Sequence, residues 1–355
     1  MIISYEEERS LTKALFMAGG MSEADADIAG TVITHSDFTG VYSHGLSRIT
    51  LFLRQLKNGS LNAKPNMKKT LDNKAVLAFD CDNGSGIVSV NKVYDEVLIK
   101  AREYGISVGT GMHGANIGCG AYYGWRAAED DVICIVCCNT FTAMAPYGGA
   151  DRLLGTNPIV ISVPTENEYP MVLDVSTSGV AFGKILAYAR EGKDIPPGWA
   201  NDIDGRPTTK SKEAYTVLPI GEHKGYGLAV MVDVLSAVLG NAAYGSDIGL
   251  VDKLETENTG FAVIIIDPSH FMPIDIFKKS ADSYVRMMKN SRPAVGVKEI
   301  FLPGEIEYKK FKETKKSGFE VGEALAAELC ELASDFGLIS ENDDFNTLMR
   351  IATAK

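Results

Sequence analysis

The chain has 355 residues, of which 45% are hydrophobic and 23% charged, and its formal net charge at pH 7 is -11. This length predicts about two domains or one large interwoven unit. The acidic balance argues against a general nucleic-acid binder, which needs a basic surface to neutralise phosphates. No apolar run reaches the roughly 18 residues that a membrane span requires.

The N-terminal segment and the cysteines bear on the cellular compartment. Residues 1–8 are acidic and lack the basic start and apolar core of a secretory signal. The six cysteines show no disulfide-framework spacing. Cys134 and Cys137 form a CxxC pair inside an apolar run, so we interpret both as core residues of a strand and not as a redox or zinc pair. We therefore expect a reduced, cytoplasmic protein without a metal.

Residues 5–58 have the apolar spacing of amphipathic helices. Ser4 and Ser22 are suitable N-caps for the first two helices, and the pair Gly19–Gly20 ends the first of them. Strands and helices then alternate, before charged amphipathic helices return near the C-terminus. The expected strands are 75–79, 106–109, 132–138, 159–163, 171–174 and 261–266, and the later helices are 87–104, 121–128, 179–190, 224–239, 275–289, 305–316 and 321–336.

This mixture of helices and buried strands predicts a mixed α/β fold. Both ends of the chain share the same helical texture. We therefore expect residues 1–70 and 305–355 to pack together as one discontinuous helical domain, with residues 71–304 forming a mixed α/β domain.

A histidine and an arginine four residues apart stand out in the run Gly40–Arg48. His44 is one of only five histidines, and the run reads as a helix start, so the side chains of His44 and Arg48 would lie on one face. A titratable proton donor beside a fixed cation suits chemistry on a carboxylate-bearing substrate. A structural histidine near a helix cap is the alternative interpretation of the local pattern.

The common nucleotide and metal fingerprints are absent. Residues 118–124 approach GxGxxG, but the third glycine is one place late and no strand directly precedes it. Residues 179–185 approach a phosphate loop, but they are one residue short and lack the Ser/Thr. No HExxH, GxSxG or paired metal-ligand spacing occurs. A Rossmann domain, a zinc enzyme and a serine hydrolase therefore have little support.

Three clusters of glycine, small residues and lysine remain. The first is 143–149 followed by 154–158, the second is 173–178 running into Gly183–Lys184, and the third is 221–227. The second and third place hydroxyls, backbone amides or a lysine near a helix N-terminus, which favours an anion such as a pyrophosphate. Each is also compatible with a simple turn before a helix.

In this order and at these spacings, the clusters resemble the malate/L-lactate dehydrogenase family, whose members lack the Rossmann fold. The match covers nearly the whole chain, and its most specific parts include Ser43–Arg48, Gly155–Pro158 and His223–Leu228. The resemblance implies a non-Rossmann oxidoreductase fold, with a helical domain from both chain ends and a central mixed-sheet, cofactor-binding domain. It also implies a homodimer that uses NAD or NADP on a small carboxylate substrate.

The resemblance also implies roles for individual residues. His44 looks like the proton donor or acceptor, and Arg48 like the residue that holds the substrate carboxylate. By analogy with the ribose-binding acid of Rossmann enzymes, Asp174 favours NAD over NADP. The residues expected to bind the cofactor are Thr140, Asn157, Leu173, Asp174, Val175, Ser176, Lys224, Gly225, Pro303, Gly304 and Glu305.

One position departs from the family pattern. Many members carry an Asn-His-aromatic-Gly segment, and here Asn116 stands at the histidine position of Ala115–Gly118. An amide donates a hydrogen bond but exchanges no proton near neutral pH. We expect Asn116 to face the substrate and His44 to be the acid/base, with a pKa near neutrality that suits both directions.

These observations predict a 2-hydroxyacid dehydrogenase that works by hydride transfer. The first alternative is a reductase of cyclic or N-alkyl imino acids, because the same site could protonate a nitrogen. A non-catalytic cofactor-binding protein is the less favoured alternative.

Overall fold

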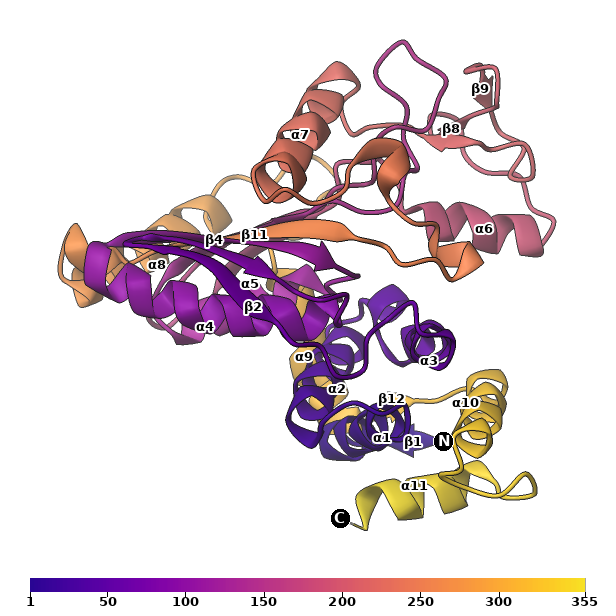
Figure 1. Ribbon diagram of the computed structural model, residues 1–355. Coiled ribbons are helices and arrows are strands. Elements are labelled where there is room, and N and C mark those ends of the chain that lie inside the picture. The colour runs from indigo at the N-terminus through magenta and orange to yellow at the C-terminus, as the bar shows by residue number, and fades with distance from the viewer. Residues whose placement is uncertain (355) are drawn as a thin grey trace.

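The computed structural model describes residues 1–354, which form three parts stacked in Figure 1: helices below, a sheet in the middle and a smaller lobe above. Helices from both chain ends make up the lower part and share one core, in which Leu15 and Phe16 pack with Leu329 and Leu348. The elements of this part are β1 (Ile2–Ile3), α1 (Tyr5–Ala18), α2 (Glu23–Phe38), α3 (Ile49–Asn58), α9 (Glu305–Ser317), β12 (Phe319–Glu320), α10 (Glu323–Asp335) and α11 (Phe345–Thr353).

Local sequence signals explain where the first helices begin. Ser4 accepts a hydrogen bond from the Glu7 N–H and Glu7 bonds back to the Ser4 N–H, so the two form a capping box. Ser22 caps α2 by accepting a hydrogen bond from the Asp25 N–H. The predicted caps at Ser4 and Ser22 are confirmed.

A mixed seven-stranded sheet forms the middle, with the strand order β2-β3-β4-β11-β5-β6-β7. Only the pair β3–β4 is parallel, and the other neighbours are antiparallel. A Rossmann sheet is mostly parallel, so this topology confirms the predicted non-Rossmann, mixed α/β class. The strands are β2 (Lys68–Asn73), β3 (Val76–Asp80), β4 (Ile106–Gly114), β5 (Ile133–Cys138), β6 (Ile159–Val163), β7 (Met171–Val175) and β11 (Thr259–Ile266).

Helices cover both faces of the sheet. α4 (Gly86–Tyr104) and α5 (Gly120–Glu129) pack on one face, whereas α7 (His223–Asp233) and the π-helical turn Val234–Val238 pack on the other. α8 (Ile274–Lys289) lies near the end of β4 that is far from the helical part (Figure 1).

The strand β5 shows why its cysteines are core residues. Cys134 and Cys138 face the core beneath α4 and α5, and Cys137 faces Val232 of α7 on the opposite side. All three are free thiols. Residues three apart on a strand point to opposite faces, so the CxxC pair cannot close on one metal or disulfide here. The prediction that these cysteines belong to the core is confirmed.

The upper lobe contains α6 (Phe182–Arg190) and a small sheet of the order β10-β8-β9. Its own core includes Met144, Ile185 and Val217. The short strands are β8 (Ala200–Asn201), β9 (Pro207–Thr208) and β10 (Thr216–Val217).

The structure differs from the predicted elements in a few places. The strand β2 and the helix α11 were not predicted; β2 is exposed along its whole length, so it lacks the apolar alternation of a half-buried strand. The expected helix 224–239 is α7 followed by the π-helical turn. The predicted domain boundaries at 70 and 305 stay a prediction, and the first falls inside β2. Within residues 1–354, no helix combines the length and the apolar character of a membrane span.

Candidate active site

A cavity of about 1020 Å³ opens between the three parts of the molecule. Its wall comes from the α2–α3 connection, the β4–α5 connection, the ends of β5 and β7, the start of α6 and the turn before α9. This volume lies at the upper end of the range for small-molecule sites, so the cavity has room for two organic ligands. The predicted site residues that line it are His44, Arg48, Asn116, Thr140, Leu173, Asp174, Val175, Ser176, Pro303 and Gly304.

Two consecutive 3-10 turns present the histidine and the arginine. The turns Tyr42–His44 and Leu46–Arg48 are joined at Gly45, and α3 begins only after Arg48. The expectation that His44 and Arg48 share one face of a helix is therefore wrong. Gly45 has extended backbone angles (φ -89, ψ -152), which interrupt the helical path. Both side chains nevertheless line the same cavity.

His44 is half-buried, and its Nδ1 lies 2.9 Å from the Ser43 Oγ. Burial lowers the pKa of His44 to about 4, and the positive charge of Arg48 adds to this shift. The expectation of a near-neutral pKa does not hold for the protein alone. With this pKa, the His44 imidazole is uncharged at pH 7.

Arg48 carries a hydrogen-bond donor that the protein does not use. Its Nε is buried and has no partner among the described residues. Burial lowers the pKa of Arg48, and the carboxyl group of Glu257 opposes this shift. The guanidinium remains charged, and a buried N–H without an acceptor is costly. An anionic ligand fits this position.

The structure adds Glu257, which sequence reasoning missed. Glu257 lines the cavity, is 5% exposed and accepts a hydrogen bond of 3.2 Å from the Gln55 Nε2. Burial raises the pKa of Glu257, while Gln55, Arg48 and the backbone N–H of Asn116 oppose this shift. Glu257 precedes β11 in the sequence and belongs to none of the motifs described above. Only the fold brings it to Arg48.

Asn116 lies in the cavity wall, as predicted from its position in the sequence. Its Oδ1 accepts a hydrogen bond of 2.9 Å from the Gly118 N–H, so the side chain closes the turn that leads to α5. The Nδ2 group is left as the donor available to a ligand.

Asp174 marks the other end of the cavity. Its Oδ2 accepts a hydrogen bond of 2.7 Å from the Ala121 N–H in the first turn of α5, where the helix dipole favours negative charge. Burial raises the pKa of Asp174 to about 6; the Ala121 bond acts against this, and the nearby charge of Glu307 adds to it. Glu307 also lines the cavity, so this end is acidic.

Thr140 lines the cavity, and Asn157 supports it from behind. The Thr140 Oγ1 accepts from the Thr156 N–H at 3.0 Å, and the Thr140 N–H lies 3.3 Å from the Asn157 Oδ1. Asn157 is fully buried, and its Nδ2 donates to the Ala229 carbonyl of α7 at 3.0 Å. Asn157 therefore does not face the cavity; it ties the Thr140 segment to α7.

Three other predicted residues also lie outside the cavity wall. Lys224 is exposed at the start of α7, and a Cβ on Gly225 would lie 2.0 Å from the Ile220 carbonyl oxygen, so Gly225 permits a close backbone approach. Glu305 turns away from its neighbours Pro303 and Gly304 into a buried ion-pair cluster. Its partners are Lys289, Tyr169 at 2.6 Å and Lys309 at 3.1 Å.

The Glu305 cluster anchors the turn that reaches the cavity. Burial alone raises the pKa of Glu305, but Lys289, Tyr169 and Lys309 together lower it to about 2. Beside it, the Pro303 carbonyl accepts from the Val172 N–H at 3.1 Å. These contacts fix the Pro303–Gly304 backbone against β7.

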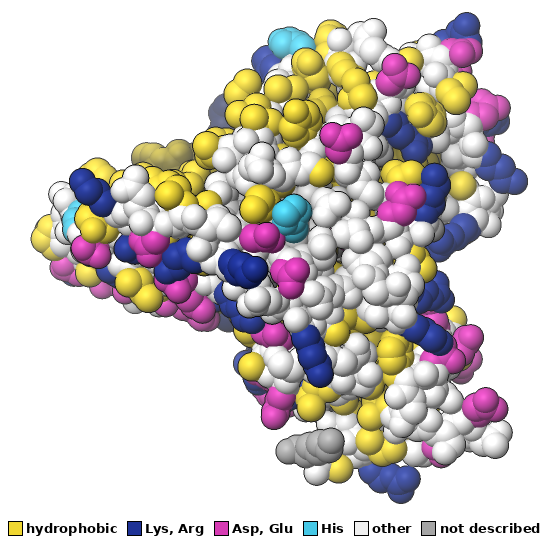
Figure 2. All heavy atoms as spheres, viewed as in Figure 1, with side chains coloured by type: hydrophobic (Ala, Val, Ile, Leu, Met, Phe, Trp, Pro, Cys, Tyr) yellow, Lys and Arg dark blue, Asp and Glu magenta, His cyan; other side chains and the backbone are white. Residues whose placement is uncertain are grey.

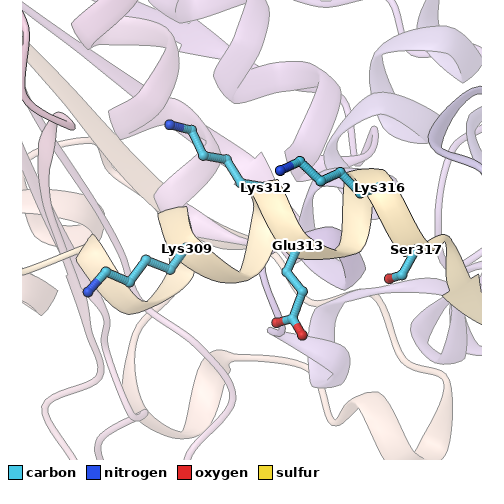
Figure 3. Close-up of a pocket in the computed structure, with 5 residues that line it drawn as sticks. All are labelled: Lys309, Lys312, Glu313, Lys316 and Ser317. Atoms are coloured by element: carbon cyan, nitrogen blue, oxygen red, sulfur yellow. The ribbon is translucent and has the colours of Figure 1, made fainter.

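A second hollow, of about 550 Å³, lies along α9 (Figure 3). It is lined by Lys309, Lys312, Glu313, Lys316 and Ser317, all from one helix. Figure 3 shows Lys312 and Lys316 on one side of the helix and Lys309 and Glu313 on the other, so the lysines do not converge on one point. This hollow therefore lacks the convergent groups that line the large cavity.

The large cavity brings together side chains from several parts of the fold. A histidine that can exchange a proton lies beside a cation with an unused donor, and a long groove with hydroxyls and a carboxylate continues from them. Such a site accommodates a small anion next to a larger ligand.

Comparisons with known proteins are specific about the family. The malate/L-lactate dehydrogenase family model matches residues 3–330. The malate/(S)-sulfolactate dehydrogenase of Methanothermus fervidus is 37% identical over 342 residues, which cover 95% of this chain and 99% of that protein. The solved sulfolactate dehydrogenase of Methanocaldococcus jannaschii has a TM-score of 0.88 at 37% identity, covering 95% of this chain and 98% of that one. The chain belongs to the malate/L-lactate dehydrogenase family.

A further solved relative is the delta1-piperideine-2-carboxylate reductase of Pseudomonas syringae pvar. tomato. It has a TM-score of 0.85 at 27% identity and covers 94% of this chain and 100% of that one. The same fold therefore carries proteins named for hydroxy-acid oxidation and for reduction of a cyclic imine.

Proposed function

We propose that the chain interconverts a small 2-hydroxy acid and its 2-oxo acid, with His44 as the proton donor or acceptor and Arg48 as the carboxylate anchor. The single observation that carries the proposal is the pairing of these two side chains in one cavity, with the Arg48 Nε lacking any partner in the described chain. Dehydrogenase relatives supply the reaction class.

The cavity fits a nicotinamide dinucleotide in its chemistry. Asp174 is an acceptor for ribose hydroxyls, and Ser176 and Thr140 contribute hydroxyls. The first residues of α6, Phe182 and Gly183, lie in the same wall, and free N–H groups at a helix start favour a pyrophosphate. When bound, the nicotinamide supplies or accepts the hydride.

In the oxidative direction, Arg48 holds the substrate carboxylate, and its planar fork fixes the orientation of the attached carbon. Neutral His44 takes the hydroxyl proton on its Nε2, while its Nδ1 stays near the Ser43 Oγ. The Asn116 Nδ2 is a further donor to the substrate oxygen. In the reductive direction, protonated His44 returns the proton to that oxygen, a contribution of roughly 10²–10⁴-fold.

Replacing the histidine tests this assignment. We expect His44→Ala to lower kcat by at least about a hundredfold, with cofactor affinity from a fluorescence titration nearly unchanged. His113→Ala is the matched control, because His113 pairs with Asp80 and lies outside the cavity wall. Near-normal turnover in His44→Ala would remove the proposed role.

Two other functions remain as rivals. A reductase of imino acids is favoured by Glu257, because a carboxylate near the reacting atoms stabilises a cationic iminium, and by the relative named for piperideine-2-carboxylate. A panel of 2-oxo acids with NADH and NADPH, each with and without methylamine, separates the two enzymes. A non-catalytic binder shows cofactor binding but no turnover on any of them.

For the cofactor, the proposal favours NAD over NADP. Some relatives carry NAD(+) in their names and others NADP(+), so membership of the family does not decide which cofactor this chain uses. Asp174 and Glu307 both line one end of the cavity. Two carboxylates there repel a 2'-phosphate, whereas Asp174 accepts hydrogen bonds from a free ribose hydroxyl.

We also propose a homodimer formed through the outer face of α7 and its π-helical turn. Figure 2 shows hydrophobic side chains gathered where α7 lies in Figure 1. Met231, Val238 and Leu239 are 57%, 53% and 61% exposed. A contiguous apolar patch of this kind marks an interaction surface. Val238→Glu is expected to halve the mass seen in light scattering; an unchanged mass would place the interface elsewhere.

A further inference from the structure

Two buried carboxyl groups lie directly beneath the loop that carries His44 and Arg48. Glu8 of α1 is fully buried and Asp37 of α2 is 1% exposed. Within residues 1–354, no lysine, arginine or histidine forms an ion pair with either. Buried acids without a cation are rare, because burying an unpaired charge is costly. The pair therefore needs its own explanation.

The contact of Asp37 with the loop is close. The Asp37 Oδ2 accepts a hydrogen bond of 2.6 Å from the Leu46 N–H. A Cβ on Gly45 would lie 1.9 Å from the Asp37 Oδ1, so only glycine lets the carboxyl group approach the backbone at this point. Gly45 and Leu46 lie between His44 and Arg48, and they join the two 3-10 turns.

The two carboxyl groups require a proton between them. Neither oxygen of Glu8 has a hydrogen-bond partner among the described residues, and the Asp37 carboxyl group is the neighbour that raises the pKa of Glu8. Two carboxylates offer only acceptors, so a hydrogen bond between them needs a proton on one. Burial raises the pKa of Glu8 well above its usual range, and Asp37 adds to this, so the pair holds a proton.

We propose that the Glu8–Asp37 pair, bonded through one proton, is a positioning element that holds the Gly45–Leu46 backbone and thereby sets His44 and Arg48 in the cavity wall. This inference rests on the proposed roles of His44 and Arg48. Asp37 accepts the Leu46 N–H, and in the proposed arrangement a protonated Glu8 donates to Asp37, which links α1 through α2 to the loop of His44 and Arg48.

The pair also makes the loop sensitive to pH. Burial raises the pKa of Asp37 to about 7, although the Leu46 and Glu8 bonds act against this. The other titratable group that interacts with the pair is Tyr5 on α1, because the charge of Glu8 adds to the rise in the pKa of its phenol. Within residues 1–354, neither His44 nor Arg48 forms an ion pair with Asp37. Protonation of Asp37 below about pH 7 removes the charge from the acceptor of the Leu46 bond, which weakens that bond.

The stability consequence has a definite sign. The folded protein binds the Asp37 proton more tightly than the unfolded chain does, so this contribution is complete below about pH 4 and is lost as the pH rises to about 7. Relative to Asp37→Asn, which does not titrate, the wild type should therefore become less stable over that window. The measurement is the difference in Tm between the two proteins from pH 4 to pH 8.

Glu8→Gln tests the shared proton. The amide donates permanently to Asp37, so we expect kcat/KM within about twofold of wild type at pH 8 and a lower pKa for the ionisation of Asp37 in the pH profile. Infrared spectroscopy of the wild type at neutral pH should show a protonated carboxyl band that Glu8→Gln lacks. Glu6→Gln is the matched control, an exposed glutamate on the same helix. An unchanged band and profile in Glu8→Gln would overturn the shared proton.

Asp37→Ala and Gly45→Ala test the positioning role. Each should lower kcat/KM for the carboxylate substrate by about tenfold or more, mainly through KM, because Arg48 is displaced, with cofactor affinity unchanged. In the double variant, the missing carboxyl leaves room for the new Cβ, so the losses should be clearly less than additive.

Additive losses of kcat/KM in the double variant would overturn the positioning role, and so would near-normal kcat/KM in both single variants. Neither result bears on the proposed function, which His44→Ala tests separately. If Asp37→Ala does not fold, Gly45→Ala and Asp37→Asn carry the test. Wild-type KM in Gly45→Ala together with a wild-type pH profile in Asp37→Asn then rejects the proposal.

Discussion

Binding of a substrate carboxylate at Arg48 should make His44 take up a proton. In the structure, burial and the Arg48 charge hold the pKa of His44 at about 4, so at pH 6 only about 1% of it is protonated. A bound carboxylate neutralises Arg48 and places a negative charge beside the imidazole, which raises its pKa. If the pKa returns to its ordinary value of about 6.5, roughly three-quarters of His44 is protonated at pH 6.

The expected uptake therefore approaches roughly 0.75 proton per site at pH 6 and falls to roughly 0.1 at pH 7.5. Oxamate, an unreactive analogue of a 2-oxo acid, is titrated into the enzyme already saturated with NADH. The calorimetric heat is measured in several buffers of different ionisation enthalpy, and its slope gives the number of protons. Because the cofactor is present before and after the titration, changes in Asp174, whose pKa is about 6, largely cancel.

His44→Gln keeps a hydrogen-bonding side chain but cannot take up the proton, so the slope should disappear in that variant. A slope that persists in His44→Gln assigns the proton to another group, such as Glu257. A wild-type slope of zero at pH 6 means that the carboxylate binds away from Arg48 or that His44 stays neutral, and either result refutes the reasoning.

Two further changes probe the two ends of the cavity. Arg48→Lys replaces a planar fork by a point charge, so KM for the carboxylate substrate should rise roughly tenfold in steady-state kinetics, and an unchanged KM would show that the carboxylate is held elsewhere. Asp174→Ser removes one of the two carboxylates near the expected ribose, so the ratio of kcat/KM for NADPH to that for NADH should rise roughly tenfold; a ratio that stays constant would place the ribose away from Asp174.

Sequence patterns were sufficient for elements whose signals are local. The caps at Ser4 and Ser22 and the apolar periodicity of the helices gave the helical ends, and the apolar runs gave most strands. The exposed strand β2 has no such pattern, because it is defined by its hydrogen bonds to β3. The π-helical turn after α7 depends on packing: a Cβ on Gly260 would lie 2.2 Å from the Ser236 carbonyl, so that carbonyl and β11 approach unusually closely.

The predicted site residues also divide into those that the sequence places correctly and those whose role depends on packing. Motif position identified His44, Arg48 and most of the predicted cofactor-binding residues, which all line one cavity, but it could not distinguish residues that line the cavity from those that support it. Asn157 and Glu305 carry the right residue types in the right segments, yet their side chains are used by internal hydrogen bonds and ion pairs. Whether a residue lines the cavity or supports it depends on the direction of its side chain, and that direction cannot be read from the neighbouring residues in the sequence.

Glu257 shows what the fold adds to the chemistry. Burial raises the pKa of Glu257, whereas Gln55, Arg48 and the Asn116 N–H favour its ionised form. In that form, with Arg48 charged and His44 neutral, this end of the cavity is formally neutral. A monoanionic 2-oxo acid then leaves one net negative charge, and proton uptake by His44 cancels it. We therefore expect binding and protonation to be coupled through the local charge.

Glu257→Gln breaks this balance while the amide still accepts from Gln55 and from the Asn116 N–H. Arg48 is then uncompensated, so it should bind the carboxylate more tightly and lower KM several-fold. The negative charge that favours the imidazolium is lost at the same time, so His44 protonates less readily and kcat for reduction should fall by a similar factor. Glu257→Asp keeps the charge and should move neither parameter as far. Opposite shifts of KM and kcat identify an electrostatic role, because a merely structural residue would raise KM, lower kcat or reduce stability without this compensation.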